Sequence, residues 1–272
     1  MRKHKWRILL LILVVILLSI VSSRVSPSLP TPDDTSISAP GEATIPSESP
    51  SVPDDISPPD VSPSASPEVS EKPKYDLPDI SIHEWNLKLV NNRNVLTESF
   101  TPDVTAIANG QYFDSRAVDA LNALVAGAAS NGYSSYISTA YRPYSTQAYI
   151  FYGKASQIAW GGEVEYAEAE IMARELVAYP GTSEHQLGLA VDIIDSADTY
   201  FVAEEVEELP LLLWLKDHCH EYGFILRYPK DKEDITGWYE PWHFRYVGLD
   251  AAKFMYENNL CLEEFIDLYL AN

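Results

Sequence analysis

Residues 23–74 set the strongest limit on what this chain can fold into, because they contain no aromatic residue and few large aliphatic ones. Pro, Ser, Asp and Glu dominate this stretch. Such a composition cannot bury enough apolar surface to offset the entropy lost when a chain is ordered. We therefore expect 23–74 to be a disordered linker, which its prolines stiffen into an extended spacer. The folded domain is then expected to occupy 75–272.

Ahead of this linker, residues 1–22 combine a basic start with an apolar run that only Ser19 interrupts. A positive flank before an apolar run directs the following chain outward. The run is short for a membrane-spanning helix, which needs about 20 apolar residues, and it also fits the core of a long signal peptide. No small-x-small cleavage pattern follows it, so we favour an apolar helix that stays as a single-pass membrane anchor. Either way, we expect export to the outer face of the cytoplasmic membrane.

The net charge of −21 argues against a nucleic-acid partner, because a polyanion would be repelled and no basic patch interrupts the acidity. Two cysteines, Cys219 and Cys261, are too few for a domain framed by disulfides. Both stand among apolar neighbours, so we interpret them as small buried side chains. A disulfide between them is the alternative for an exported protein.

From Tyr75 onward, helical and strand-like patterns are mixed without a regular βαβ order. Apolar stripes and helix-stop signals predict helices at 115–130, 145–159, 164–178, 211–222, 249–258 and 262–270. Apolar runs bounded by turn residues predict strands at 136–141, 187–194, 223–227 and 242–247. This mixture favours an α+β fold, a single domain with a central antiparallel sheet flanked by helices.

Two of the six histidines, His185 and His243, stand in or next to predicted strands. Alternation along the strand 187–194 places Asp192 between apolar neighbours on a face that we expect to be buried. A carboxylate in that position needs a partner, and a metal ion is one of the few adequate ones. We therefore expect Asp192 and His243 to project from neighbouring strands toward one point, with His185 delivered by the preceding turn.

Another pair, His218 and His220, flanks Cys219, but these imidazoles are poor candidates for a shared metal. On a helix, residues i and i+2 point about 200° apart, so the two rings cannot chelate one ion. Glu240 precedes His243 by three residues, and Pro241 biases it toward an extended backbone. That backbone would turn the Glu240 carboxylate into the cavity as a base rather than a fourth ligand; a surface carboxylate is the alternative.

Two imidazoles, one buried carboxylate and one spare carboxylate supply what a catalytic zinc site requires: three protein ligands, an open position for water, and a base. The pattern Ser-x-His-Gln-x-Gly-x-Ala-x-Asp at 183–192, followed by Glu-Pro-Trp-His-Phe-Arg-Tyr-Val-Gly at 240–248, resembles the VanY-type zinc D-alanyl-D-alanine carboxypeptidases. This family also includes the peptidoglycan L,D-carboxypeptidases. Further blocks at 89–91, 140–147 and 223–229 extend the resemblance over most of the predicted domain.

Carried onto this sequence residue by residue, the resemblance implies that His185, Asp192 and His243 bind Zn²⁺. It implies Glu240 as the general base and Arg142 as the group that stabilises the reacting carbonyl. A structural ion pair is the alternative role for Arg142. The implied fold is that of hedgehog and D,D-peptidase domains.

The same resemblance implies that Gln147 and Ser183 hold the end of the peptide and that Tyr228 and Trp242 are walls of the pocket. The implied reaction removes the terminal D-alanine from peptidoglycan stem peptides in the cell-wall space, and we expect the enzyme to act as a monomer. One alternative is L,D-cleavage of tetrapeptide stems. Another is a zinc-stabilised wall-binding module without turnover, which would have no use for Glu240.

Overall fold

The computed structural model describes residues 75–196 and 203–271, all of which belong to the unit Ser70–Asn272. The predicted anchor, 1–22, and the predicted linker, 23–74, lie outside the described residues, and both stay predictions. Within the described ranges, no helix is long and apolar enough to cross a membrane.

Four strands form the central sheet, in the order β3–β4–β6–β5, and every neighbouring pair is antiparallel. The strands are β3 (Tyr136–Thr139), β4 (Ala190–Ile194), β5 (Phe224–Tyr228) and β6 (Glu240–Tyr246). The predicted α+β fold with an antiparallel sheet is confirmed. The strand predicted from residue 187 begins later, because Glu184–Leu187 form a 3₁₀ helix, η3, before it.

The central pair of the sheet, β4 and β6, fixes which side chains meet. Its register places Asp192 opposite His243 and Val191 opposite Phe244. Residues opposite one another on antiparallel strands point to the same face. Asp192 and His243 therefore share one face, as predicted, while Val191 and Phe244 are buried in the apolar core on the other.

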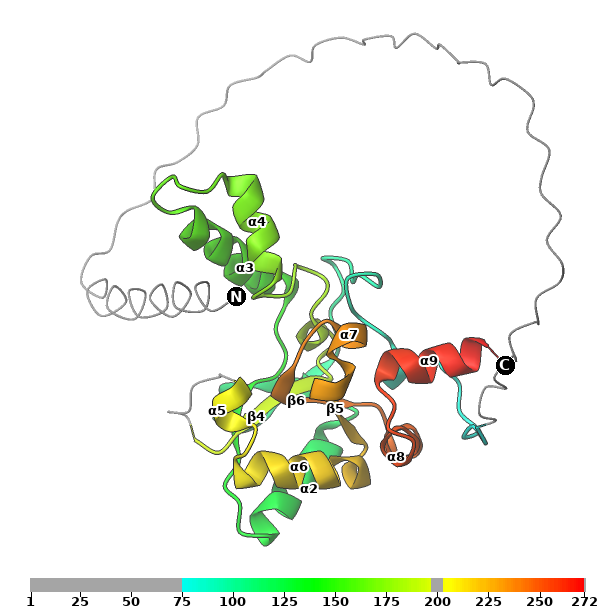
Figure 1. The fold of residues 1–272 in the computed structure, drawn as a ribbon. Helices are drawn as coiled ribbons and strands as arrows, with labels where there is room; N and C mark the ends of the chain where they lie inside the picture. Colours follow the sequence, from blue (N-terminus) through cyan, green and yellow to red (C-terminus); the bar gives the residue numbers. More distant parts are fainter. Residues whose placement is uncertain (1–74, 197–202, 272) are drawn as a thin grey trace, which may run out of the picture. The chain divides into compact units, whose positions relative to one another are not determined.

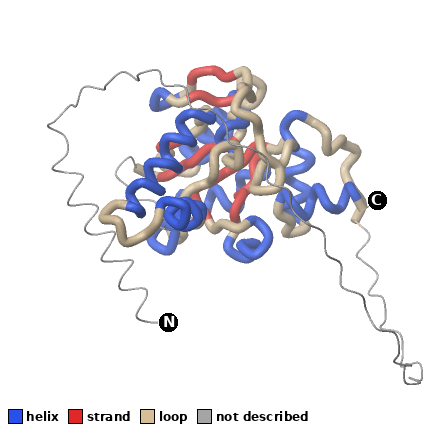
Figure 2. Tube along the Cα trace, turned by 90° about the horizontal axis from the view of Figure 1, so that it is seen from above, coloured by secondary structure: helices blue, strands red, loops and turns tan. Residues whose placement is uncertain are grey.

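Helices surround the sheet (Figure 2). On its apolar side, α6 (Pro210–His218) contacts β4, β5 and β6, and α2 (Val118–Ser130) packs beside α6 (Figure 1). In α2, one stripe at helical spacing is buried, as predicted; its members are Leu121, Leu124 and Ala128. A second apolar cluster joins α8 (Leu249–Glu257) and α9 (Leu262–Leu270) to Ile225 of β5, separately from the main core.

A helical pair, α3 (Tyr144–Ala159) and α4 (Tyr166–Arg174), stands to one side of the sheet (Figure 1). It has a small core of its own, made of Phe151, Ala155 and Ala173. Helix α4 ends four residues before its predicted limit at 178. Residues 175–177 form turns after it, and Pro180 disfavours a helical backbone in the residue before it.

The remaining elements are short, and most were not predicted. Strands β1 (Val104–Ala106) and β2 (Tyr112–Asp114) form a separate hairpin, and α5 (Ala203–Val206) and α7 (Glu233–Thr236) are single turns. The helix predicted at 211–222 ends at His218 and continues as the 3₁₀ helix η4 (Cys219–Tyr222). Further 3₁₀ turns are η1 (Trp85–Leu87), η2 (Ala108–Gly110) and η5 (Lys230–Lys232). Cys219 and Cys261 are both buried and both free, so the disulfide alternative is wrong.

Candidate active site

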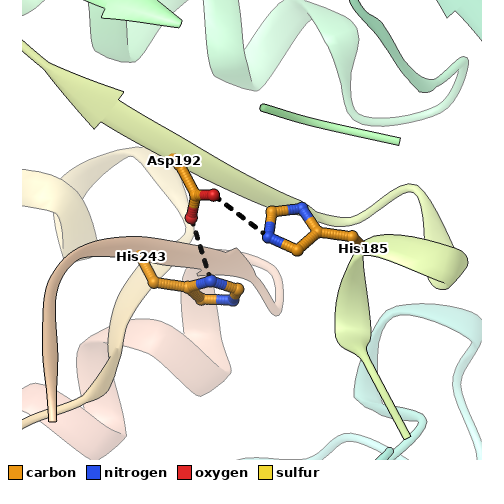
Figure 3. Close-up of side chains that lie close together, drawn as sticks. All are labelled: His185, Asp192 and His243. Atoms are coloured by element: carbon orange, nitrogen blue, oxygen red, sulfur yellow. Dashed lines mark ion pairs between the residues drawn. The ribbon is translucent and has the colours of Figure 1, made fainter. Parts of the chain in front are cut away.

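Three side chains from three elements point toward one another on the polar side of the sheet (Figure 3). His185 comes from η3, Asp192 from β4 and His243 from β6. One ligand atom from each lies within 4.8 Å of the other two. Nε2 of His185 is 3.2 Å from Oδ2 of Asp192, and Nδ1 of His243 is 3.0 Å from Oδ1 of Asp192. The predicted convergence of these three residues is therefore confirmed.

A glycine explains how His185 reaches the two strands. Helix η3 ends at Gly188, whose φ of 73° lies in the left-handed region that glycine enters without strain. An added Cβ at Gly188 would lie 3.2 Å from Pro102 and 3.3 Å from Val104, so the turn is also tightly packed. The chain can thus reverse directly into β4 and hold His185 beside Asp192.

The hydrogen bonding of His185 shows that the cluster fits a cation. Its Nδ1 lies 2.7 Å from the carbonyl oxygen of Ala140, which can only accept, so the hydrogen is on Nδ1. Burial lowers the pKa of His185, which keeps the ring neutral and Nε2 bare. Two acceptors, Nε2 and the Asp192 carboxylate, then face each other at 3.2 Å. A cation between them removes that repulsion.

The kinds of donor atom in this cluster fit zinc. Zinc bonds of about 2.0–2.2 Å to nitrogen and oxygen place the ligand atoms of a tetrahedral site roughly 3.3–3.6 Å apart. The 3.2 Å between Nε2 of His185 and Oδ2 of Asp192 is close to this spacing, and one ligand atom from each of the three residues lies within 4.8 Å of the others. Two imidazoles and one carboxylate also match the usual donor set of a catalytic zinc site.

A cavity of about 210 Å³ opens beside the three metal-site residues. It is smaller than the roughly 300–1,000 Å³ of sites for drug-sized ligands, so it suits a short terminal group. Its other polar or aromatic lining residues are Arg142, Gln147, Thr182, Ser183, Glu184, Tyr228, Trp238 and Glu240.

Glu240 lies at the edge of this cavity, at the first position of β6. Its Oε2 is 3.5 Å from Nδ1 of His243, and its side chain is 27% exposed. Burial raises the pKa of Glu240 to about 7, against the opposing effect of the charge on His243. A carboxylate with that pKa can take up and release a proton near neutral pH. Because Glu240 lines the cavity, the alternative that it is merely a surface carboxylate is excluded.

Arg142 brings a positive charge to the same cavity from the segment between β3 and α3. Its Nη2 donates to Oγ of Ser183 at 3.3 Å, and its Nε is buried without a hydrogen-bond partner. Burial lowers the pKa of Arg142, and the carboxylates that oppose this effect are those of the site, Asp192 and Glu240. The guanidinium therefore serves the cavity rather than a structural ion pair elsewhere.

Gln147 presents a free acceptor to the cavity. Its Nε2 donates to the carbonyl oxygen of Ala178 at 2.6 Å. Its Oε1 is buried and has no partner. Because the amide is held by this bond, Gln147 can receive a hydrogen bond from a ligand N–H.

Comparison with known proteins identifies the family. A family model described as VanY, D-alanyl-D-alanine carboxypeptidase, matches residues 110–249, which are more than half of the chain. The chain belongs to the VanY family of D-alanyl-D-alanine carboxypeptidases. The D-alanyl-D-alanine carboxypeptidase of Enterococcus faecalis is 38% identical over 185 residues, which are 68% of this chain and 66% of that enzyme.

Two solved structures agree with this assignment. A mutant of the vancomycin-resistance D,D-pentapeptidase VanY, in complex with Zn(II), matches with a TM-score of 0.58 and 38% identity, over 67% of this chain and 99% of that one. The L,D-carboxypeptidase LdcB matches with a TM-score of 0.58 and 38% identity, over 66% of this chain and 85% of that one. The Zn(II) of the first relative and the His-Asp-His cluster of this VanY-family chain together support zinc as its cofactor.

One predicted pocket wall is wrong. Trp242 precedes His243 on β6, so alternation turns its indole to the opposite face, where it packs against the apolar core. The tryptophan that lines the cavity is Trp238, in the turn before β6. Tyr228 lines the cavity as predicted, with its ring centroid 4.9 Å from that of His243.

The pair His218 and His220 does not form a site. Nδ1 of His218 lies 2.9 Å from Glu221, whereas the ring of His220 stacks on Tyr256 with a centroid separation of 3.7 Å. The two imidazoles thus have different partners, as expected from their spacing.

Sequence reasoning missed three charged residues beneath the site: Glu184, Arg227 and Arg245, whose side chains are completely buried. One signal points to them. Arg227 and Arg245 stand in strands between large apolar residues, and a buried cation in such a strand requires a carboxylate partner. The identity of that partner, Glu184, follows only from the folded structure.

Proposed function

We propose that this chain removes the terminal D-alanine from peptidoglycan stem peptides that end in D-alanyl-D-alanine. The observation that carries the proposal is Glu240, a carboxylate with a pKa of about 7 beside a three-residue zinc site in a small cavity. When bound, zinc polarises a carbonyl group and lowers the pKa of a water molecule to about 7.

The proton of the reaction moves through Glu240. Its carboxylate accepts a proton from the attacking water and then donates it to the amine of the departing D-alanine. Glu240 suits both transfers by position, because its carboxylate lines the cavity beside the metal site. Negative charge that develops on the carbonyl oxygen is stabilised by Arg142, whose guanidinium is already held in the cavity by Ser183.

The polar groups of the cavity suit a peptide end. Gln147 offers its unpartnered Oε1, which can accept a hydrogen bond from a peptide N–H. The hydroxyl of Ser183 accepts a hydrogen bond from Arg142, so its own hydrogen is available for a terminal carboxylate. We therefore assign Gln147 to the peptide backbone and Ser183 to the carboxylate end.

A second candidate is L,D-cleavage of tetrapeptide stems. The likeness to the L,D-carboxypeptidase LdcB, at 38% identity, favours it. The two reactions differ in the configuration of the residue before the scissile bond. The third alternative, a wall-binding module without turnover, has less support, because binding does not require the carboxylate that Glu240 places beside the metal site.

We further propose that the enzyme is a monomer that works outside the cytoplasmic membrane, where 1–22 anchors it and 23–74 acts as a spacer. The support is the apolar run and the proline-rich composition of these segments. In a fully extended polyproline conformation, such a spacer would reach on the order of 100 Å. A spacer of that length would let the enzyme reach stem peptides that are fixed in the peptidoglycan mesh.

The decisive experiment is mass spectrometry of the products that the purified protein makes from pentapeptide and tetrapeptide stems. We expect loss of one D-alanine from the pentapeptide, abolished by a chelator and restored by Zn²⁺. Cleavage of the tetrapeptide alone would establish the L,D-reaction. Stoichiometric zinc without cleavage of either peptide would favour the binding module.

A further inference from the structure

The carboxylate of Glu184 lies directly beneath the metal site. Its side chain is fully buried, and Oε1 accepts hydrogen bonds from Nε of Arg227 and from Nη1 of Arg245, both at 2.8 Å. Glu184 immediately precedes the metal-site residue His185 in η3. A buried carboxylate needs such cationic partners. The two arginines therefore satisfy one oxygen of Glu184, Oε1.

The other oxygen of Glu184 faces His243. Oε2 is buried and has no hydrogen-bond partner, and it lies 3.8 Å from Nε2 of His243, which is also buried and without a partner. An orphan acceptor and an orphan ring nitrogen thus face each other. The opposite ring nitrogen, Nδ1, is the one that faces Asp192 at 3.0 Å.

We propose that Glu184 is a positioning residue for His243: it holds the hydrogen on Nε2, so that the bare Nδ1 is directed at the metal. This inference rests on the zinc site of the proposed function. Metal-binding histidines commonly donate their second N–H to a carboxylate or a carbonyl, which orients the ring and raises its basicity as a ligand. A ring shift of roughly 0.9 Å would bring the 3.8 Å separation to ordinary hydrogen-bond length.

The two histidines of the site would then be oriented in complementary ways. His185 gives its Nδ1 hydrogen to the carbonyl of Ala140 and presents Nε2 to the site. His243 gives its Nε2 hydrogen to Glu184 and presents Nδ1. Each ring has one nitrogen fixed by an acceptor behind it and the other free for the metal.

The surrounding cations hold Glu184 in place. Oε1 accepts hydrogen bonds from both Arg227 and Arg245 at 2.8 Å, so two cations compensate the buried carboxylate. Arg227 is itself clamped by two bonds to Glu263 of α9, at 2.9 and 2.7 Å. Nη2 of Arg245 donates to two main-chain carbonyls, those of Asn86 and Lys88. The carboxylate therefore has little freedom to move away from His243.

A purely structural role, in which Glu184 only neutralises the two arginines, is the competing explanation. The variant Glu184→Gln distinguishes this structural role from the positioning role. Glu263→Gln is the matched control. Glu263 belongs to the same network through Arg227, but it bonds to none of the three metal-site residues. Both variants should lower the melting temperature, since each removes a carboxylate from a buried arginine.

The measurement is the zinc dissociation constant of each full-length variant, obtained by competition with a chromophoric chelator. We expect Glu184→Gln to weaken zinc binding by about 10- to 100-fold and Glu263→Gln to leave it unchanged. Wild-type affinity in Glu184→Gln, or equal weakening in both variants, would overturn the proposal. Because zinc affinity does not depend on which peptide bond is cleaved, this result is independent of the proposed reaction.

Glu184→Asp provides a second test should the glutamine variant not fold. It keeps the negative charge that Arg227 and Arg245 require, but it withdraws the carboxylate from the arginines and from His243 by about one carbon–carbon bond. We expect a folded protein with weakened zinc binding and a melting temperature that falls less than that of Glu184→Gln. Zinc affinity equal to that of the wild type would refute the positioning role.

Discussion

Replacement of Glu240 by glutamine tests the central chemical assignment. Glutamine has nearly the same size and can still hold a water molecule, but it cannot accept the proton. The three metal-site residues do not include Glu240, and the contact between His243 and Asp192 at 3.0 Å does not depend on it. We therefore expect Glu240→Gln to retain zinc and to lose turnover.

The size of this loss follows from the position of the carboxylate. Glu240 stands 3.5 Å from His243 and lines the cavity in which the reacting peptide bond would lie. General base catalysis of this kind contributes about 10²- to 10⁴-fold, which equals about 2.7–5.4 kcal/mol of activation free energy. Because the cavity keeps its shape, the loss should appear in kcat rather than in KM.

The assay follows D-alanine release from a pentapeptide and measures zinc content by elemental analysis. Glu175→Gln is the matched control, because it makes the same chemical change at an exposed residue outside the cavity lining. A Glu240→Gln variant that keeps more than about a tenth of the wild-type kcat would refute the assignment of the base. Loss of zinc from that variant would instead show that Glu240 is a ligand.

Four further predictions concern the metal, the protonation of the site, the fold and the linker. Asp192→Ala should lower the zinc content to well below one ion per chain, as elemental analysis would show. In the metal-free protein, burial raises the pKa of Glu240 from 4.5 to about 7, so the folded state binds its proton more tightly than the unfolded state does. This group's contribution to stability should therefore be present at low pH and be lost as pH rises from about 4.5 to 7, and Glu240→Gln should flatten that part of the melting-temperature profile. Gly181→Ala should destabilise the fold by about 1–3 kcal/mol in denaturant unfolding, since φ is +88° and the new Cβ would lie 2.6 Å from the carbonyl oxygen of Leu96. A chain that begins at Tyr75 should be soluble and should cleave small peptides; loss of that activity would contradict the spacer role of 23–74.

The part of the site that lies on strands was predictable from sequence, because side-chain direction in a strand has a period of two. That rule places Asp192 and His243 on one face, and the register of β4 and β6 confirms it. The same rule turns Trp242 away from His243, so the error over Trp242 arose from the family resemblance rather than from the alternation. The rule does not place Glu240, which lines the cavity with His243 although it lies three positions earlier on β6, where the pairing with β5 is irregular.

Elements without enough residues to show a period were missed. Strands β1 and β2 have three residues each, and η3 has four. No window of that length distinguishes a strand from a turn. Trp238 lies in such a segment, before β6, and its place in the cavity follows from how β5 and β6 are connected.

The charged network beneath the site could not be predicted, since its members lie far apart in the sequence. Glu184 meets Arg227 and Arg245 only because η3 packs against the polar side of β5 and β6. Sequence indicates that two arginines in apolar strands need a partner, whereas the fold decides that the partner adjoins one metal-site histidine and faces the other. The carboxylate of Glu184 therefore has two roles: it neutralises the two buried arginines, and it orients His243. A change in Glu184 should therefore affect both stability and zinc binding, whereas a change in Glu263 should affect stability alone.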